Sequence, residues 1–191
     1  KTLWVKSPNC SKSFGFFYIC KKIKMEQEEE LLPKVSFSHF ISKFPVVELP
    51  ILLSEESIHD FSNENPPLPT LMIQQYLSMP GDDEFTEYIP CFKLPDTKDF
   101  HAIVYWKAGL MDYQYMLATF SAKGIPIDLK VLSGLTVVDN KIIQSVANID
   151  EEWIITVAIG QMEGEDTVYD AGTSRMTSME LLANGMIVMS T

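Results

Sequence analysis

Cysteine is scarce in this chain of 191 residues. The three cysteines, Cys10, Cys20 and Cys91, are too few and too scattered for a disulfide framework, and no Cys-x-x-Cys pair exists for metal or redox chemistry. This pattern favours a reducing compartment, and we predict a cytoplasmic location. The alternative is an exported protein whose N-terminal tail is the remnant of a targeting segment, with a Cys10–Cys20 bond.

Recognisable catalytic motifs are also lacking. His39, His59 and His101 do not have the spacing of metal ligands, and the chain has no Gly-x-Ser-x-Gly elbow, phosphate-binding glycine loop or dinucleotide fingerprint. We therefore expect no catalytic residue, no metal and no cofactor. A hydrolase with a cleft formed by the β strands is the alternative, because catalytic groups can come from distant positions. A deep pocket that gathers His101 with two carboxylates would favour this alternative.

Long hydrophobic runs are absent, since no apolar segment reaches the roughly 20 residues of a membrane span. The run Phe14–Cys20 is short and is flanked by lysines within a basic tail, residues 1–24, that contains no carboxylate. Two interpretations of the tail stay open. Either it is an upstream extension and the functional chain begins at Met25, or it is a genuine basic tail that contacts a membrane surface or the acidic body. We predict residues 25–191 to be a single β-rich domain.

Basic residues are few after the tail, and acidic residues are abundant. The net charge is −11, but the tail holds six of the 15 basic residues and none of the 26 acidic ones. The nine basic and 26 acidic residues from Met25 onward therefore give a net charge of −17. Such a surface repels nucleic acid and attracts basic partners, so we expect no nucleic-acid binding. The simpler explanation is that the acidic residues keep the protein soluble.

The region from Phe100 to Gly160 is rich in β-branched and aromatic residues, and turn residues interrupt it at short intervals. Short connections require antiparallel neighbours, so we predict an α+β, mainly β fold with an antiparallel meander of six to nine strands. Within 125–131, odd-numbered apolar residues alternate with Pro126, Asp128 and Lys130, which predicts a strand with one solvent-facing side. Pro126 indicates an edge position or the first residue of the strand.

The flanking regions add short helices and hairpins to this prediction. One or two N-terminal helices are expected, the first capped by Ser36 with an apolar stripe of Phe37, Phe40, Ile41 and Phe44, and the second a brief turn capped by Ser54. Residues 63–69 are expected to be a polyproline-like connector, and 70–77 fit a helix or a strand equally well. Pro90 indicates a second edge strand. Residues 121–124, with Gly124 able to take positive φ, predict a hairpin turn before 125–131, and Asn184-Gly185 predicts a final hairpin.

One acidic segment is the candidate binding site. Its carboxylates could contact a basic partner or hold calcium, although a solvated hairpin tip is the simpler interpretation. Paired carboxylates for glycoside chemistry could come from Asp139 or from 150–152, all in predicted turns. We expect a non-enzymatic acidic interaction protein, for example an immunity or inhibitor protein that masks a basic protein. The partner-binding residues predicted in the acidic segment are Glu163, Glu165, Asp166 and Asp170.

Overall fold

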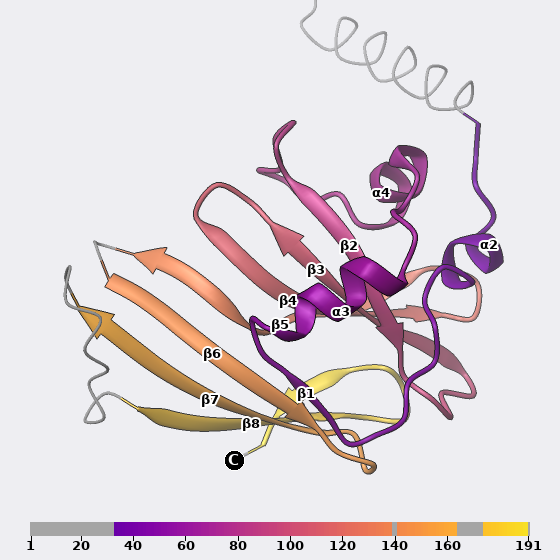
Figure 1. The fold of residues 1–191 in the computed structure, drawn as a ribbon. Helices are drawn as coiled ribbons and strands as arrows, with labels where there is room; N and C mark the ends of the chain where they lie inside the picture. The colour runs from indigo at the N-terminus through magenta and orange to yellow at the C-terminus, as the bar shows by residue number, and fades with distance from the viewer. Residues whose placement is uncertain (1–32, 139–140, 164–173, 191) are drawn as a thin grey trace, which may run out of the picture. The chain divides into compact units, whose positions relative to one another are not determined.

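The computed structural model describes residues 33–138, 141–163 and 174–190, and for the last two residues of the middle range it describes the backbone only. The contacts between residues group Val35–Thr191 into one compact unit, which is described here by itself. This unit is dominated by one nine-stranded sheet (Figure 1).

Three short helices precede or interrupt the first strands. They are α2 (Phe37–Ile41), α3 (Ser57–Glu64) and α4 (Thr70–Tyr76). The strands are β1 (Ile51–Leu53), β2 (Glu87–Lys93), β3 (Phe100–Ala108), β4 (Asp112–Ser121), β5 (Pro126–Val138), β6 (Lys141–Ile149), β7 (Ile154–Glu163), β8 (Arg175–Leu181) and β9 (Ile187–Met189).

The strands from β2 to β9 pair in sequence order, and every named pair is antiparallel. The predicted meander is therefore confirmed. Gly124 and Gly185 have the positive φ angles, +80° and +84°, that the two predicted hairpin turns need. Pro90 lies on β2, which is an edge of the sheet as predicted, and the side-chain amide of Asn65 donates to the edge carbonyls of Pro90 and Cys91.

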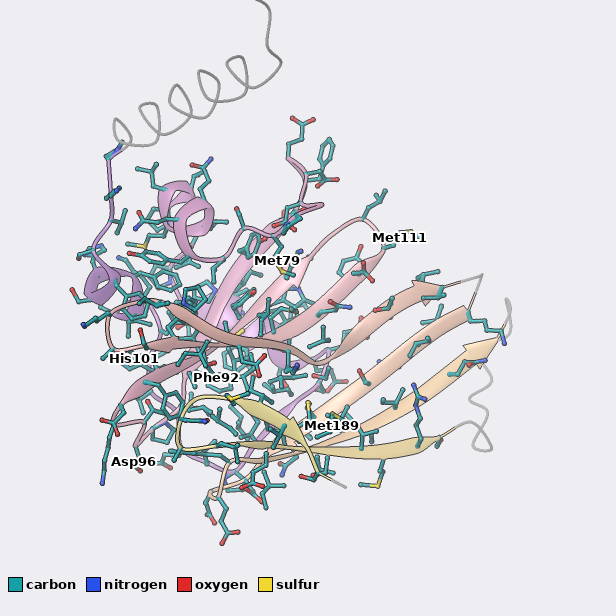
Figure 2. All side chains as sticks on the ribbon, turned by 180° about the vertical axis from the view of Figure 1, so that it is seen from behind. Met79, Phe92, Asp96, His101, Met111 and Met189 are labelled. Atoms are coloured by element: carbon teal, nitrogen blue, oxygen red, sulfur yellow. The ribbon has the colours of Figure 1, made fainter. Side chains whose placement is uncertain are left out.

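One hydrophobic core packs residues of β2–β4 against residues of β6–β9, so these two halves of the sheet face each other. Figure 2 shows Phe92 between the halves and Met111 at the tip of the β3–β4 hairpin. Ile58 and Phe61 of α3 also pack against this core. We call it the inner core; its buried members are Leu53, Cys91, Phe92, Leu94, Phe100, Ala102, Val104, Trp106, Tyr115, Leu117, Leu132, Ala147, Ile149, Ile155, Val157, Met179, Leu181 and Ile187.

A second core lies on the other side of β2–β4, where α2 and α4 cover the sheet. Ser36 caps α2 as predicted by accepting a hydrogen bond from the backbone N–H of His39. The predicted apolar stripe is confirmed, because Phe40, Ile41 and Phe44 are buried. We call this cluster the helix-side core; its buried members are Phe40, Ile41, Phe44, Leu68, Met72, Leu77, Tyr88, Ile103, Tyr105, Met116, Ala118 and Phe120.

The two halves meet along β5, which is long enough to belong to both. Its first part pairs with β4, and only Gly134–Val138 also pair with β6. Beyond this point β1 takes the place of β5 beside β6. Gly134 lies at the divergence with φ +141°, and a Cβ atom there would meet the carbonyl oxygen of Tyr113 at 2.0 Å. Glycine is required at this junction because the chains approach so closely.

The alternation predicted for 125–131 holds only in part, because Pro126 is exposed and Leu129 packs against the helix-side core as predicted, whereas other positions differ. Ile125, Ile127 and Val131 are 62%, 37% and 46% exposed, whereas Asp128 is only partly exposed. Asp128 is held inside because its carboxylate accepts the backbone N–H of Ile187 at 2.9 Å and thereby links β5 to β9. An insertion of Leu132 into the β4–β5 register then brings two consecutive residues, 132 and 133, into buried positions.

The short helices agree with the predicted fold class, and α4 (Thr70–Tyr76) shows that the segment left open between helix and strand is helical. The second predicted helix differs in its extent. The turn predicted at Ser54 is an eight-residue helix, α3, whose N-cap position is Glu56 without a side-chain capping bond. It extends to Glu64, which was expected to lie in the connector. Packing of Ile58 and Phe61 on the inner core stabilises this helix, and such a tertiary contact leaves no local signal.

Candidate functional site

The acidic segment predicted from the sequence is largely outside the described residues. Glu163 is the last residue of β7, and only its backbone is described; Glu165, Asp166 and Asp170 lie outside the described ranges. The partner-binding role of these carboxylates therefore stays a prediction.

His101 lies among aromatic side chains on the helix side of the sheet. Its ring makes an edge contact with Phe37, with 5.6 Å between the ring centroids, and its partner across the strands is Phe120. Burial, with a smaller contribution from Lys93, lowers the pKa of His101 below its usual value. No carboxylate in the described part of the chain is hydrogen-bonded to this histidine, so the described surroundings of His101 do not form the triad-like arrangement that would favour a hydrolase.

The other predicted carboxylates have structural roles or lie apart. Asp150 accepts the backbone N–H groups of Glu152 and Ile154 and so shapes the β6–β7 turn. Glu151 and Glu152 are exposed, and Asp139 is outside the described residues. Within the described ranges, no group of three or more His, Cys, Asp or Glu residues could hold a metal ion.

A polar network fastens the segment after α4 to the sheet. The carboxylate of Asp82 pairs with Lys107, accepts the hydroxyl of Tyr88 and accepts the backbone N–H of Met79 at 2.6 Å. Burial raises the pKa of Asp82, but the bonds from Lys107 and Tyr88 outweigh it, and the net pKa lies below the usual value. The three side chains satisfy one another, so this network is part of the fold rather than an available catalytic group.

Beside this network, a hollow of about 440 Å³ lies between the end of α4 and the strands β3–β5. Leu77, Met79, Ala118 and Leu129 are among its apolar lining residues. Because its lining belongs mostly to the helix-side core, it is a packing gap at the edge of that core.

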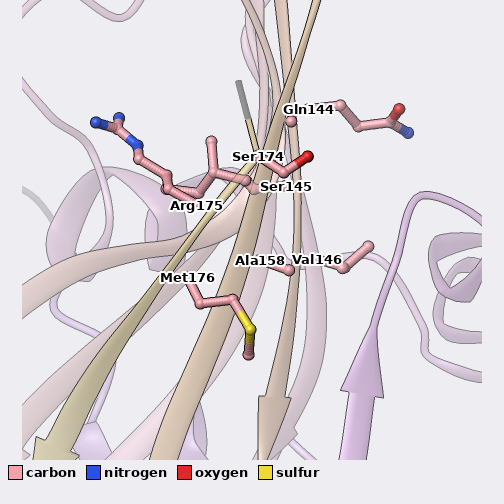
Figure 3. A pocket seen from close by; sticks show the side chains of 9 residues that line it. Gln144, Ser145, Val146, Ala158, Ser174, Arg175 and Met176 are labelled. Atoms are coloured by element: carbon pink, nitrogen blue, oxygen red, sulfur yellow. The ribbon is translucent and has the colours of Figure 1, made fainter. Parts of the chain in front are cut away.

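A larger hollow, of about 590 Å³, is lined by β6–β8 (Figure 3). Most of its lining residues lie on the face away from the inner core, whereas Ser145, Ile159 and Arg175 lie on the inner-core face. Figure 3 shows the side chains of Gln144, Val146 and Met176 on one side of the strands and that of Arg175 on the opposite side. The small residues Ala158 and Gly160 belong to β7, which lies between β6 and β8. We call this hollow the β6–β8 trough; its lining is Gln144, Ser145, Val146, Ala158, Ile159, Gly160, Ser174, Arg175 and Met176.

The strand register explains the shape of the trough. Ala158 pairs with Val146 on one side and with Met176 on the other, and Gly160 pairs with Gln144. Paired residues point to the same side of a sheet, so the central strand contributes a low floor and its neighbours contribute higher walls. Met176 is 72% exposed.

A carboxylate lies at the side of the trough that β6 forms. The amide of Gln144 donates to the carboxylate of Glu55 at 3.2 Å, and Glu55 is followed by Glu56, the N-cap residue of α3. From there a line of exposed carboxylates follows the helix, because Glu56, Asp60 and Glu64 are spaced at i, i+4 and i+8. The ion pairs Lys107–Asp82 and Lys130–Asp128 of the described part of the chain do not involve α3.

The trough lies beside the N-terminal end of α3. Glu55, whose carboxylate accepts the side-chain amide of Gln144, is two residues before the first residue of α3. Glu55 therefore connects the trough with the exposed carboxylates that follow it in the sequence.

Sequence reasoning missed this surface. The sequence shows the small residues Ala158 and Gly160 on either side of Ile159, but the surface that they form depends on which strands flank β7. The carboxylate spacing in 56–64 was also visible, but it has meaning only in a helix.

No helix in the described part of the chain has the length and apolar character that a bilayer crossing requires.

The chain was compared with known proteins at the level of family, sequence and structure. No protein-family model, curated protein or solved structure matches it. Its function must therefore be inferred from the geometry and charge of its own residues.

Proposed function

We propose that this protein is a non-enzymatic, acidic interaction protein that binds a basic protein through the carboxylates of α3. An immunity or inhibitor protein that masks a basic toxin or nuclease is one concrete form. The observation that carries the proposal is the line of exposed, unneutralised carboxylates formed by Glu56, Asp60 and Glu64 among the described residues.

These carboxylates are not needed to hold α3 in place. The opposite face of the helix packs through Ile58 and Phe61 on the inner core, and Asn65 fastens its C-terminal end to β2. Like charges at i, i+4 destabilise a helix, and Glu64 lies at the C-terminal end, where the helix dipole disfavours an anion. These carboxylates therefore destabilise the helix without supporting its packing, as is often found for residues that serve binding.

The charge of the whole chain supports the same partner class. A net charge of −11 steers cationic molecules toward the protein and repels anionic ones. Complementary charges chiefly increase the association rate and select among partners, and their effect falls with salt. Binding to a basic partner should therefore weaken as ionic strength rises.

The first test uses a labelled oligo-lysine peptide, with binding followed by fluorescence anisotropy from low to high ionic strength. We expect salt-sensitive binding that weakens in the triple variant Glu56→Gln, Asp60→Asn and Glu64→Gln. The matched control is Glu151→Gln, Glu152→Gln and Glu180→Gln, which removes the same charge from other exposed positions.

The control should retain most of the affinity, because those carboxylates are not on α3. Equal losses in the two triple variants would mean that only net charge matters and would refute a site on α3. Binding that does not change with salt would refute electrostatic recognition altogether.

A further inference from the structure

The β6–β8 trough and the carboxylates next to it form a surface that is partly apolar and partly anionic. Such a surface indicates which kind of segment of a basic protein could bind. We infer that the trough binds a basic amphipathic helix of the partner, whose apolar side chains enter the trough while its lysines or arginines meet Glu55 and Glu56. The inference rests on the proposed function for the charge of the partner, but the trough itself is a separate observation.

The walls and floor of the trough determine which part of a partner can enter it. Val146 and Met176 offer apolar walls, and Ala158 and Gly160 leave a floor without large side chains. The trough is on a sheet face and not at a sheet edge, so it offers side chains rather than free backbone groups. A helix docks through side chains in this way, whereas an added strand needs a free edge.

The other half of the same sheet shows how such a face is covered. On β2–β4 the face away from the inner core is covered by α2 and α4 through large aromatic residues such as Phe40. On β6–β8 no element among the described residues covers the corresponding face, although Ile154, Val146 and Ala158 place apolar groups there. A partner helix would take the position that α2 and α4 take on the first half.

Charge complementarity selects a basic helix over an acidic or neutral one. Glu55 is at hydrogen-bonding distance from Gln144, at the rim of the trough, and Glu56 follows it in an exposed position. An acidic helix would meet like charges at this rim, which is unfavourable. The combination of an apolar trough and an anionic rim therefore fits a basic amphipathic segment.

The test compares two probes on the full chain. The first is a synthetic Leu/Lys peptide with an amphipathic helical pattern, and the second is oligo-lysine, which has the charge without the apolar face. In the variant Ala158→Phe the new ring fills the trough. We expect this variant to weaken binding of the Leu/Lys peptide by about tenfold, the effect of losing one interface anchor, while oligo-lysine binding is unchanged.

The matched control is Ile125→Phe, which introduces the same ring at a position that is 62% exposed in the turn before β5 and does not line the trough. It should leave the binding of both peptides unchanged, and circular dichroism should show that both variants retain their β structure. If Ala158→Phe binds the Leu/Lys peptide as the parent does, while oligo-lysine still binds in a salt-sensitive manner, the trough inference is wrong and the proposed function stands. If neither probe binds the parent at low salt, the proposed function fails.

Two other ligands of the trough would be recognised by different outcomes of these experiments. A Leu/Glu peptide of the same pattern that binds as tightly as the Leu/Lys peptide would show that the trough is apolar but not selective for charge, which overturns the inference. A second copy of the chain would give concentration-dependent self-association in sedimentation that Ala158→Phe abolishes, and this result would also overturn it.

Discussion

The two halves of the sheet bury their outer faces to very different degrees. On β3 and β4 both sides are covered, one by the inner core and the other by α2 and α4. On β6–β8 one side meets the inner core and the other carries a trough with small residues at its floor. An antiparallel sheet can leave one face uncovered, but an uncovered face with an apolar hollow is typical of a binding surface. Both halves therefore contribute to the inner core, but only the first half is also covered on its outer face; in our proposal the uncovered outer face of the second half receives the partner.

The largest loss of stability is expected when an aromatic side chain is removed from the covered half of the sheet. Phe40 is fully buried and its ring stacks on Tyr76, with 4.5 Å between centroids. Phe40→Ala should lower the free energy of unfolding by about 3–5 kcal/mol because it leaves a cavity. Urea denaturation measures the loss. Met176→Ala on the uncovered half should change stability by less than about 0.5 kcal/mol, and similar losses in the two variants would contradict this difference between the halves.

The junction between the halves can be broken at Gly134. Gly134→Ala places a Cβ atom against the carbonyl of Tyr113 and requires a strained φ, so it should cost at least about 2 kcal/mol. Gly81 is the control, because its φ is +100° but no atom lies within 4 Å of the added Cβ. Gly81→Ala should cost about 1 kcal/mol. Equal unfolding free energies for the two variants would mean that close approach at the junction has no effect.

A smaller effect is expected at Asp128, which joins β5 to β9. Burial raises the pKa of this carboxyl, but hydrogen bonds from the backbone of Ile187 and Leu129, helped by Lys130, lower it to a net value below the usual one. Asp128→Asn should cost about 1–2 kcal/mol near neutral pH by removing charge-assisted bonds.

The stabilisation that Asp128 provides should decrease in acid. Because the folded pKa of Asp128 lies below the unfolded value of roughly 3.9, its stabilisation is complete above the unfolded value and is lost as the pH falls through the folded pKa. Urea denaturation over a pH series should show the parent and Asp128→Asn converging as the solution becomes acidic. A difference between them that stays constant with pH would show that the charge of Asp128 does not stabilise the contact.

The smallest effect concerns the carboxylates beside the uncovered half. Glu64→Gln should raise the free energy of unfolding by roughly 0.2–0.5 kcal/mol at low salt, because it removes the repulsion from Asp60 and an anion at the wrong end of the helix dipole. Glu56→Gln is the control, since Glu56 lies at the favourable end of α3. A loss of stability in Glu64→Gln would mean that this carboxylate supports the fold, which would weaken its assignment to a binding surface.

Local sequence signals predicted the meander well. The glycines at 124 and 185 and the prolines at 90 and 126 are each located where a turn, an edge strand or the first residue of a strand was expected. These signals succeed because backbone dihedral limits and the missing proline donor act within a few residues. The bulge at Leu132 and the length of α3 were not predictable, since both depend on partners from other parts of the chain.

The site was less predictable than the fold. The acidic segment chosen from the sequence lies mostly outside the described residues, and the trough was not foreseen at all. Val146, Ala158 and Met176 are far apart in the sequence and become neighbours only through strand pairing. Likewise, the carboxylates of α3 form a line only because 57–64 is helical.

The sequence by itself determined the acidic charge, the alternation of strands and turns and the antiparallel order, because composition and short connections act locally. Only the tertiary structure decided which face of each strand is buried, as Asp128 of β5 shows by bonding to β9 while Val131 of the same strand is exposed. The physical reason is that burial depends on what packs against a face, and helices α2 and α4 cover one half of the sheet but not the other.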